Sequence, residues 1–185
     1  MALKEQPKVK NYTRYPLSSI ALYNGVTVLH FVLGGLGIML GYHSWLGYLL
    51  GFLYLAFAFG QMYIIVPLAV CPNCVYYRME NSLCISAMNR VSKKIASEGN
   101  PDDFPKRGEG LLCHNHLYMA ALFAPILLII PALILDFSFW VLGLLLVVLG
   151  LLLYRFFIVF PQKACNHCYA KYKCPNAKMM NLQDT

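Results

Sequence analysis

Hydrophobic residues along the chain gather in four long stretches that polar residues interrupt at only a few positions. The stretches run from Leu17 to Leu40, Leu46 to Val70, Leu117 to Leu135 and Phe137 to Phe160. Each has about the 20 residues that a helix rising about 1.5 Å per residue needs to cross a bilayer core. Their apolar residues are continuous rather than alternating, which disfavours membrane-spanning strands. The pattern predicts an all-α integral membrane protein with four transmembrane helices.

Both halves of the chain carry the same motif just after their second hydrophobic stretch. Pro-x3-Cys-x2-Cys begins at Pro67 and again at Pro161, and this shift of 94 residues also overlays residues 63–66 on 157–160. One more cysteine follows each motif, so the clusters are Cys71, Cys74 and Cys84, and Cys165, Cys168 and Cys174. Two apolar helices that end in proline also resemble each other by composition alone. We predict two repeated helical hairpins with a cysteine cluster at the same end of each.

These patterns divide the chain into four parts. Residues 1–16 form a basic arm, 17–84 the first hairpin with its CxxC-x9-C cluster, 85–112 a loop, and 113–185 the second hairpin with a CxxC-x5-C tail. Within the loop, the stretch from Ile85 to Glu98 predicts a short amphipathic helix on the membrane surface. Its apolar side carries Ile85, Met88, Val91 and Ile95, and its basic side Arg90, Lys93 and Lys94.

The basic residues indicate how the helices are oriented. All fifteen Lys and Arg lie before Leu17, between Cys71 and His116, after Pro161, or at Arg155 near the end of the fourth stretch, which we expect to snorkel to the interface. The positive-inside rule then places both termini and the Cys-rich loop and tail in the cytoplasm, with the protein in the inner membrane. Sidedness explains the net charge of +7, so we expect no nucleic-acid partner. A basic inner surface also favours anionic lipid headgroups of the bilayer.

All seven cysteines lie on the predicted cytoplasmic side, where thiols are kept reduced. An odd number would also leave one thiol without a disulfide partner. Clustered thiolates in this compartment are typical of a zinc site, an iron–sulfur cluster or thiol redox chemistry. In a Cys-x2-Cys knuckle, a tight turn lets both sulfurs face one metal centre. The sequence therefore predicts metal binding rather than disulfide bonds.

Histidines enlarge the predicted ligand set, because His114 and His116 follow Cys113 closely. His167 lies inside the second knuckle, between two candidate ligands, and we leave it out. The candidate metal ligands are Cys71, Cys74, Cys84, Cys113, His114, His116, Cys165, Cys168 and Cys174. Two sites would divide them into Cys71, Cys74, Cys84 and Cys113, and Cys165, Cys168 and Cys174 with His114 or His116. Parallel repeats facing each other would instead form one shared site from Cys71, Cys74, Cys165 and Cys168.

His30 is a candidate intramembrane polar site, because it lies midway along the first hydrophobic stretch. Ionisable groups at this depth face the bundle interior or a cavity. A haem ligand, a quinone contact and a proton relay are the functional interpretations. The alternative is a neutral imidazole that bonds to a neighbouring helix, near Tyr54 or Gln61. No second histidine lies at the same depth, which disfavours haem.

The predicted function is that of a membrane metalloprotein whose cytoplasmic cysteines hold an iron–sulfur cluster or zinc. It would transfer electrons or act as an accessory subunit, with a protein partner in a membrane complex and possible contact with a quinone. Two alternatives remain: a structural zinc scaffold or assembly factor, and a quinone-coupled thiol oxidoreductase. The sequence carries no recognisable nucleotide-binding glycine loop, paired-carboxylate site or serine triad. Hydrolase and phosphotransferase functions are therefore disfavoured.

Overall fold

The computed structural model describes residues 10–111 and 113–182. Residues 1–9 of the predicted basic arm, residue 112 of the predicted loop and residues 183–185 of the predicted tail lie outside this part. Within it the chain is helical and has no β-strand, only one isolated bridge between Arg14 and Leu83. The prediction of an all-α protein is confirmed.

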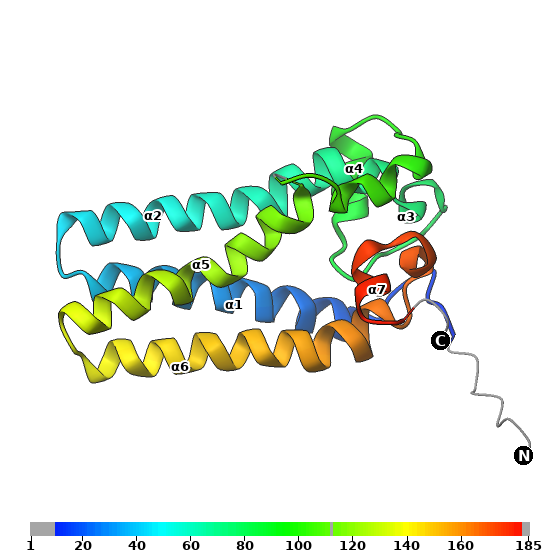
Figure 1. Ribbon diagram of the computed structural model, residues 1–185. Coiled ribbons are helices and arrows are strands. Elements are labelled where there is room, and N and C mark those ends of the chain that lie inside the picture. Colours follow the sequence, from blue (N-terminus) through cyan, green and yellow to red (C-terminus); the bar gives the residue numbers. More distant parts are fainter. Residues whose placement is uncertain (1–9, 112, 183–185) are drawn as a thin grey trace, which may run out of the picture.

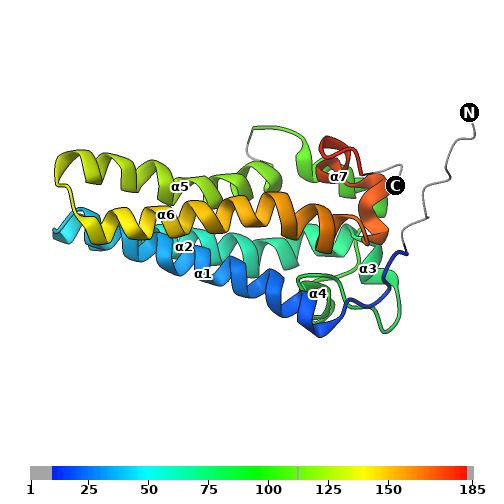
Figure 2. The same cartoon turned by 90° about the horizontal axis from the view of Figure 1, so that it is seen from below.

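Four of the described helices are long and apolar enough to span a membrane. They cover Leu17–Gly41, Trp45–Asn73, His114–Leu135 and Phe139–Cys165. Figures 1 and 2 show that they run side by side, with both tight turns of the hairpins at one end of the bundle. The prediction of four helices long and apolar enough to cross a bilayer is confirmed. The second and fourth extend beyond the predicted ends at Val70 and Phe160, because each hydrophobic stretch continues as helix into its Cys-x2-Cys motif.

The second and fourth spans share a distortion before their cysteine motifs. The α-helix α2 (Trp45–Gly60) continues as the π-helical segment η1 (Gln61–Val70), and α6 (Phe139–Tyr154) continues as η4 (Arg155–Cys165). Each segment contains a proline, Pro67 or Pro161, which lacks an N–H group and cannot complete the α-helical hydrogen bonds. Wider π-helical turns accommodate the break and set the direction in which each motif leaves the helix.

Helix α1 (Leu17–Gly41) packs against α2, α5 (His114–Leu135) and α6. Glycine permits its close approach to α5, because a Cβ atom on Gly34 would lie 2.7 Å from the Cβ of Pro125. Similarly, a Cβ atom on Gly51 would lie 2.9 Å from the Gly35 carbonyl oxygen. Small residues of this kind hold membrane helices together through close backbone contact. A larger residue at either position would push neighbouring helices apart.

Short helical elements gather at the end of the bundle opposite the two hairpin turns, which we call the thiol end (Figure 1). They are η2 (Cys71–Asn73), α3 (Val75–Arg78), α4 (Met88–Ile95), η3 (Pro101–Gly108), η5 (Tyr169–Lys173) and α7 (Pro175–Met179). Both ends of the described chain also lie there (Figure 2).

Helix α4 is shorter than the predicted amphipathic helix from Ile85 to Glu98. Ala87 takes the left-handed backbone conformation, with φ of 60°, and so the helix begins only after it. Ala96 is extended and ends the helix. The α4 side that packs on the protein is polar, with Asn89 and Ser92 buried, while the predicted apolar side is largely exposed.

Candidate functional site

Six cysteines from both halves of the chain line one cavity of about 170 Å³ at the thiol end. We call it the thiol cavity. Its cysteines are Cys71, Cys74, Cys84, Cys165, Cys168 and Cys174. Hydrophobic side chains from η1, η3 and η4 complete much of the wall, so the thiols face a partly apolar interior. The fold thus brings together the two cysteine clusters that the sequence separates by 94 residues.

The two Cys-x2-Cys knuckles have the same local geometry. The Cys74 N–H donates to the Cys71 carbonyl at 3.0 Å, and the Cys168 N–H donates to the Cys165 carbonyl at 3.2 Å. The first cysteine of each pair belongs to the end of a long helix, and the second follows the tight turn. Each knuckle is therefore anchored on a rigid element, as a preorganised ligand pair requires.

Asn89 fixes the third cysteine of the first cluster, and sequence reasoning missed it. The Cys84 N–H donates to Asn89 Oδ1 at 3.1 Å, and Asn89 Nδ2 donates to the carbonyl oxygens of Ser82 and Tyr76 at 3.2 and 3.3 Å. A buried amide with these partners holds the loop from the first knuckle to Cys84 in one conformation. The only feature of the sequence that could have indicated this role is a polar residue at a position of α4 that faces the protein.

The N-terminal arm joins the two clusters. Tyr15 N–H donates to the carbonyl of Leu83, which precedes Cys84, and the Tyr15 hydroxyl donates to the carbonyl of Ala164, which precedes Cys165. His167 Nδ1 donates to the Lys10 carbonyl at 2.9 Å. His167 also stacks on the Tyr12 ring at 4.5 Å. His167 thus binds the arm.

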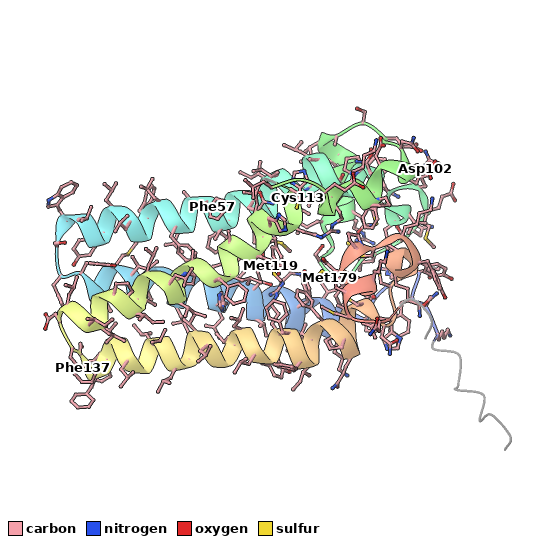
Figure 3. The ribbon with its side chains drawn as sticks, in the orientation of Figure 1. Phe57, Asp102, Cys113, Met119, Phe137 and Met179 are labelled. Carbon is pink, nitrogen blue, oxygen red and sulfur yellow. The ribbon has the colours of Figure 1, made fainter. Side chains whose placement is uncertain are left out.

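The other predicted ligands occupy different places. Cys113 is absent from the wall of the thiol cavity, and its Sγ accepts the His116 N–H at the start of α5 (Figure 3). His116 Nδ1 donates to the Leu111 carbonyl at 3.1 Å. His114 does line the cavity, and its buried Nδ1 has no hydrogen-bond partner in the described part of the chain. His114 is thus the histidine that can add a ligand to the six thiols.

Burial keeps the thiols of Cys74 and Cys168 in their neutral form when no cation is bound. Burial, with smaller contributions from the thiols of Cys84 and Cys174, raises the pKa of Cys74 to about 12. The Tyr76 N–H and Arg107 oppose this rise. Burial also raises the pKa of Cys168, and Cys74 adds to this effect. The two halves therefore interact electrostatically, and a bound metal centre would have to displace protons from these thiols.

Arg107 places a positive charge at the wall of the thiol cavity. Its Nε donates to Asn115 Oδ1 at 3.1 Å, and its guanidinium lies 5.3 Å from the centre of the Phe104 ring. These contacts hold the side chain of a polar loop residue against the cavity. Sequence reasoning missed this role, because the sequence of η3 predicts only an ordinary polar turn.

Arg155 lies inside the bundle, so the prediction that it snorkels to the interface is wrong. Its side chain is fully buried, and its Nη1 donates to the Thr27 hydroxyl. Three rings that line the thiol cavity surround the guanidinium, with ring centres 4.7 to 5.4 Å away: Tyr23, Tyr118 and Phe160. Cation–π contacts favour this place over the interface. The four spans contain no Asp or Glu, and Nε and Nη2 have no hydrogen-bond partner among the described residues.

His30 is buried in α1 and bonds to a neighbouring helix. Its Nε2 donates to the Leu122 carbonyl of α5 at 3.0 Å. Tyr54, one of the expected neighbours, donates instead to the Ala121 carbonyl at 3.1 Å. His30 does not line the thiol cavity. Its observed contacts are those of an imidazole that ties α1 to α5.

The thiols surround a space rather than converge on one point. In the described part of the chain, no three His, Cys, Asp or Glu side chains lie close enough together to hold a metal ion. A comparison of the chain with protein-family models, curated proteins and solved structures finds no match. The chemistry of the site therefore rests on its own residues.

Proposed function

We propose that this protein holds one iron–sulfur cluster in the thiol cavity and transfers single electrons between a soluble donor and a membrane partner. The observation that carries the proposal is the gathering of six thiols from both halves around one cavity. Cysteine thiolates are the usual ligands of such clusters, and four suffice. Cys113 stays outside this proposed ligand set because it does not line the cavity, and His114 is an additional candidate.

The spread of the thiols supports a cluster rather than a single zinc ion. Zinc holds four sulfurs at about 2.3 Å, which brings all of them around one point. The cavity thiols are arranged around a volume of about 170 Å³ and do not form such a group. A cluster of several iron and sulfide atoms can bridge ligands on opposite walls. This favours one shared centre that draws on both Cys-x2-Cys pairs.

The positive charges near the cavity also favour an anionic cofactor. Four thiolates bring four negative charges into a partly apolar space, where unpaired charge is costly. Arg107 lines the cavity, and Arg155 lies behind three of its aromatic rings. Both arginines would stabilise the cluster and make its reduction easier.

The distribution of basic residues supports a cytoplasmic thiol end in the inner membrane. Lys and Arg are concentrated in the segments that meet at this end, and the hairpin turns around His43 and Asp136 have none. A reducing cytoplasm would keep the cysteines available as ligands. The two π-helical segments begin at Gln61 and Arg155, 94 residues apart, which is also the shift between the motifs. This coincidence supports the proposed internal repeat.

Anaerobic purification of the full-length protein in lipid nanodiscs tests the proposal. We expect a brown protein with equal amounts of iron and acid-labile sulfide, and an electron paramagnetic resonance signal in either the reduced or the oxidised form. A colourless protein with stoichiometric zinc would contradict electron transfer and support a structural scaffold. Protein without metal whose cavity cysteines cycle between thiol and disulfide with quinone would support a thiol oxidoreductase.

A further inference from the structure

A second cavity of about 230 Å³ lies beside the thiol cavity, between the start of α5, η4 and α7. We call it the side cavity. Its wall is mostly apolar and consists of Asn115, Tyr118, Met119, Phe156, Phe160, Cys165, Asn176, Met179 and Met180. Figure 3 shows Met119 on α5 and Met179 on α7, the helices on two sides of the cavity. An apolar cavity of about 150 Å³ already accommodates a benzene ring.

The side cavity and the thiol cavity share part of their walls. Tyr118, Phe160, Cys165 and Asn176 line both. Cys165 belongs to the proposed ligand set, so a molecule in the side cavity would touch a cluster ligand directly. The side cavity also lies where the spans His114–Leu135 and Phe139–Cys165 meet the thiol end.

Polar groups in the wall can orient a ligand that carries oxygen. The Tyr118 hydroxyl is buried near the Tyr23 hydroxyl and the Arg155 guanidinium, yet it makes no hydrogen bond of normal geometry within the described chain. A bound acceptor would supply the well-formed hydrogen bond that buried hydroxyls normally make. Asn115 Nδ2 donates to Asn176 Oδ1 at 2.9 Å, which ties α7 to α5 across the cavity.

We propose that the side cavity binds the headgroup of a membrane quinone, with one carbonyl oxygen accepting from Tyr118 and the ring between Phe156 and Met179. The electron-transfer role of this site rests on the proposed function. Reduction of the quinone to quinol takes two electrons, passed singly from the cluster, and two protons from water. The soluble one-electron donor restores the cluster after each transfer. Aromatic and methionine side chains suit a planar, polarisable ring.

Photolabelling of the full-length protein in nanodiscs tests this inference, with an azido-benzoquinone that carries a short alkyl tail as the probe. We expect the label on peptides of α5, η4 and α7, and its removal by excess unlabelled ubiquinone analogue. Y118F should weaken the binding of the probe roughly tenfold, as expected for one lost hydrogen bond to a buried group. M119W should prevent labelling by filling the cavity.

Two matched substitutions control for indirect effects. Tyr154 and Phe157 line neither cavity, and Phe157 is 71% exposed on the bundle surface. Y154F and F157W should therefore label like the wild type. Labelling that excess quinone does not remove, or that Y118F and M119W leave unchanged, would overturn the inference. Iron and sulfide analysis of the same samples tests the cluster separately, so specific labelling of iron-free protein would contradict only the proposed function.

Discussion

The two π-helical segments have the same backbone distortion but different electrical surroundings. Each begins with a buried polar side chain and leads into a Cys-x2-Cys knuckle. In η1 this residue is the neutral Gln61, whose Nε2 donates to the His114 carbonyl at 3.4 Å. In η4 it is the charged Arg155, held by Thr27 and aromatic rings. Both halves therefore share the same backbone distortion. Only the second half places a charged side chain, Arg155, near the thiol cavity.

The knuckles also differ in what covers them. The loop after the first knuckle is held by the buried amide of Asn89, which fixes Cys84. The second knuckle is held by the N-terminal arm, which contacts it through Tyr15 and His167. The first cysteine cluster is thus held both by this local amide and by the arm, which also bonds to Leu83 and Tyr76, whereas the second relies on the arm, a segment distant in sequence.

The largest expected effect comes from removing either cysteine pair. If both halves serve one centre, C71S/C74S and C165S/C168S should each lose essentially all bound iron and the paramagnetic signal. Metal analysis of the purified variants measures this. C113S is the matched control and should keep its iron, because Cys113 does not line the cavity. Retention of half the iron in each double variant would indicate two centres and contradict a shared one.

The next largest effect concerns the reduction potential, which should depend on Arg155 of η4 but not on Gln61 of η1. R155M should lower the reduction potential of the proposed iron–sulfur cluster, because it removes a positive charge that favours the added electron. A shift on the order of 50 mV is expected for a charge in this surrounding. R155K should restore most of the potential, and Q61M should change it little. Redox titration monitored by visible absorption measures all three.

Thermal unfolding distinguishes this electrostatic role from a structural one. Arg155 has no acid partner in the four spans, so R155M removes a charge that is costly to bury and breaks no ion pair. R155M should therefore keep the melting temperature of the wild type. An unchanged potential together with a large loss of stability would contradict the role assigned to Arg155.

A smaller effect concerns the thiols at matched positions of the two knuckles. Burial raises the pKa of both Cys74 and Cys168, so in cofactor-free protein both should be neutral at pH 8. Because only the thiolate is nucleophilic, we expect alkylation at least about tenfold slower than for glutathione. Mass spectrometry of peptides after timed alkylation measures each site.

The same pKa shifts predict how pH affects the cofactor-free protein. A thiol whose pKa is raised in the folded state contributes its full stability to the fold at pH values below the ordinary pKa of a thiol. This contribution is lost as the pH rises above about 9. Rapid alkylation of either thiol at pH 8 without loss of helical circular dichroism would contradict the burial of that knuckle.

The smallest effect is expected at the surface contact between the two halves. Lys173 Nζ lies 2.7 Å from Asp102 Oδ1, and its hydrogen bond lowers the pKa of this carboxyl. The stability that this contact gives the folded protein is fully present at pH values above the ordinary aspartate pKa. It disappears as the pH falls through the lowered pKa of Asp102. Both side chains are exposed, so D102N should leave the melting temperature and the iron content close to those of the wild type. A loss of iron would show that this contact positions the cysteines of the second half.

The sequence was sufficient to predict the four spanning helices and the candidate cysteines. Uninterrupted apolar stretches of the right length leave the backbone few choices in a bilayer. The motif spacing also identified all six cysteines of the thiol cavity. Their convergence on one cavity was among the open alternatives, because sequence does not specify how the two hairpins pack.

The remaining features depend on tertiary contacts. Arg155 was expected at the interface because a lone charge near a helix end usually reaches water, yet three rings from different helices enclose it. Asn89 looks like an ordinary polar loop residue until the hydrogen bonds around Cys84 are seen. The π-helical form of both spans was also missed, because proline predicts a disturbed helix without specifying the kind.

The bridging arm has a consequence for biosynthesis. Tyr12 and Tyr15 precede the four described spans in the chain, but they bind Ala164 near the end of the fourth span and His167 just after it. A nascent chain that contains only the first hairpin offers this arm Tyr76 and Leu83 but lacks its partners in the second half. The complete thiol cavity can therefore form only after the fourth span and the second knuckle have been synthesised, and the proposed cofactor could be inserted only from then on.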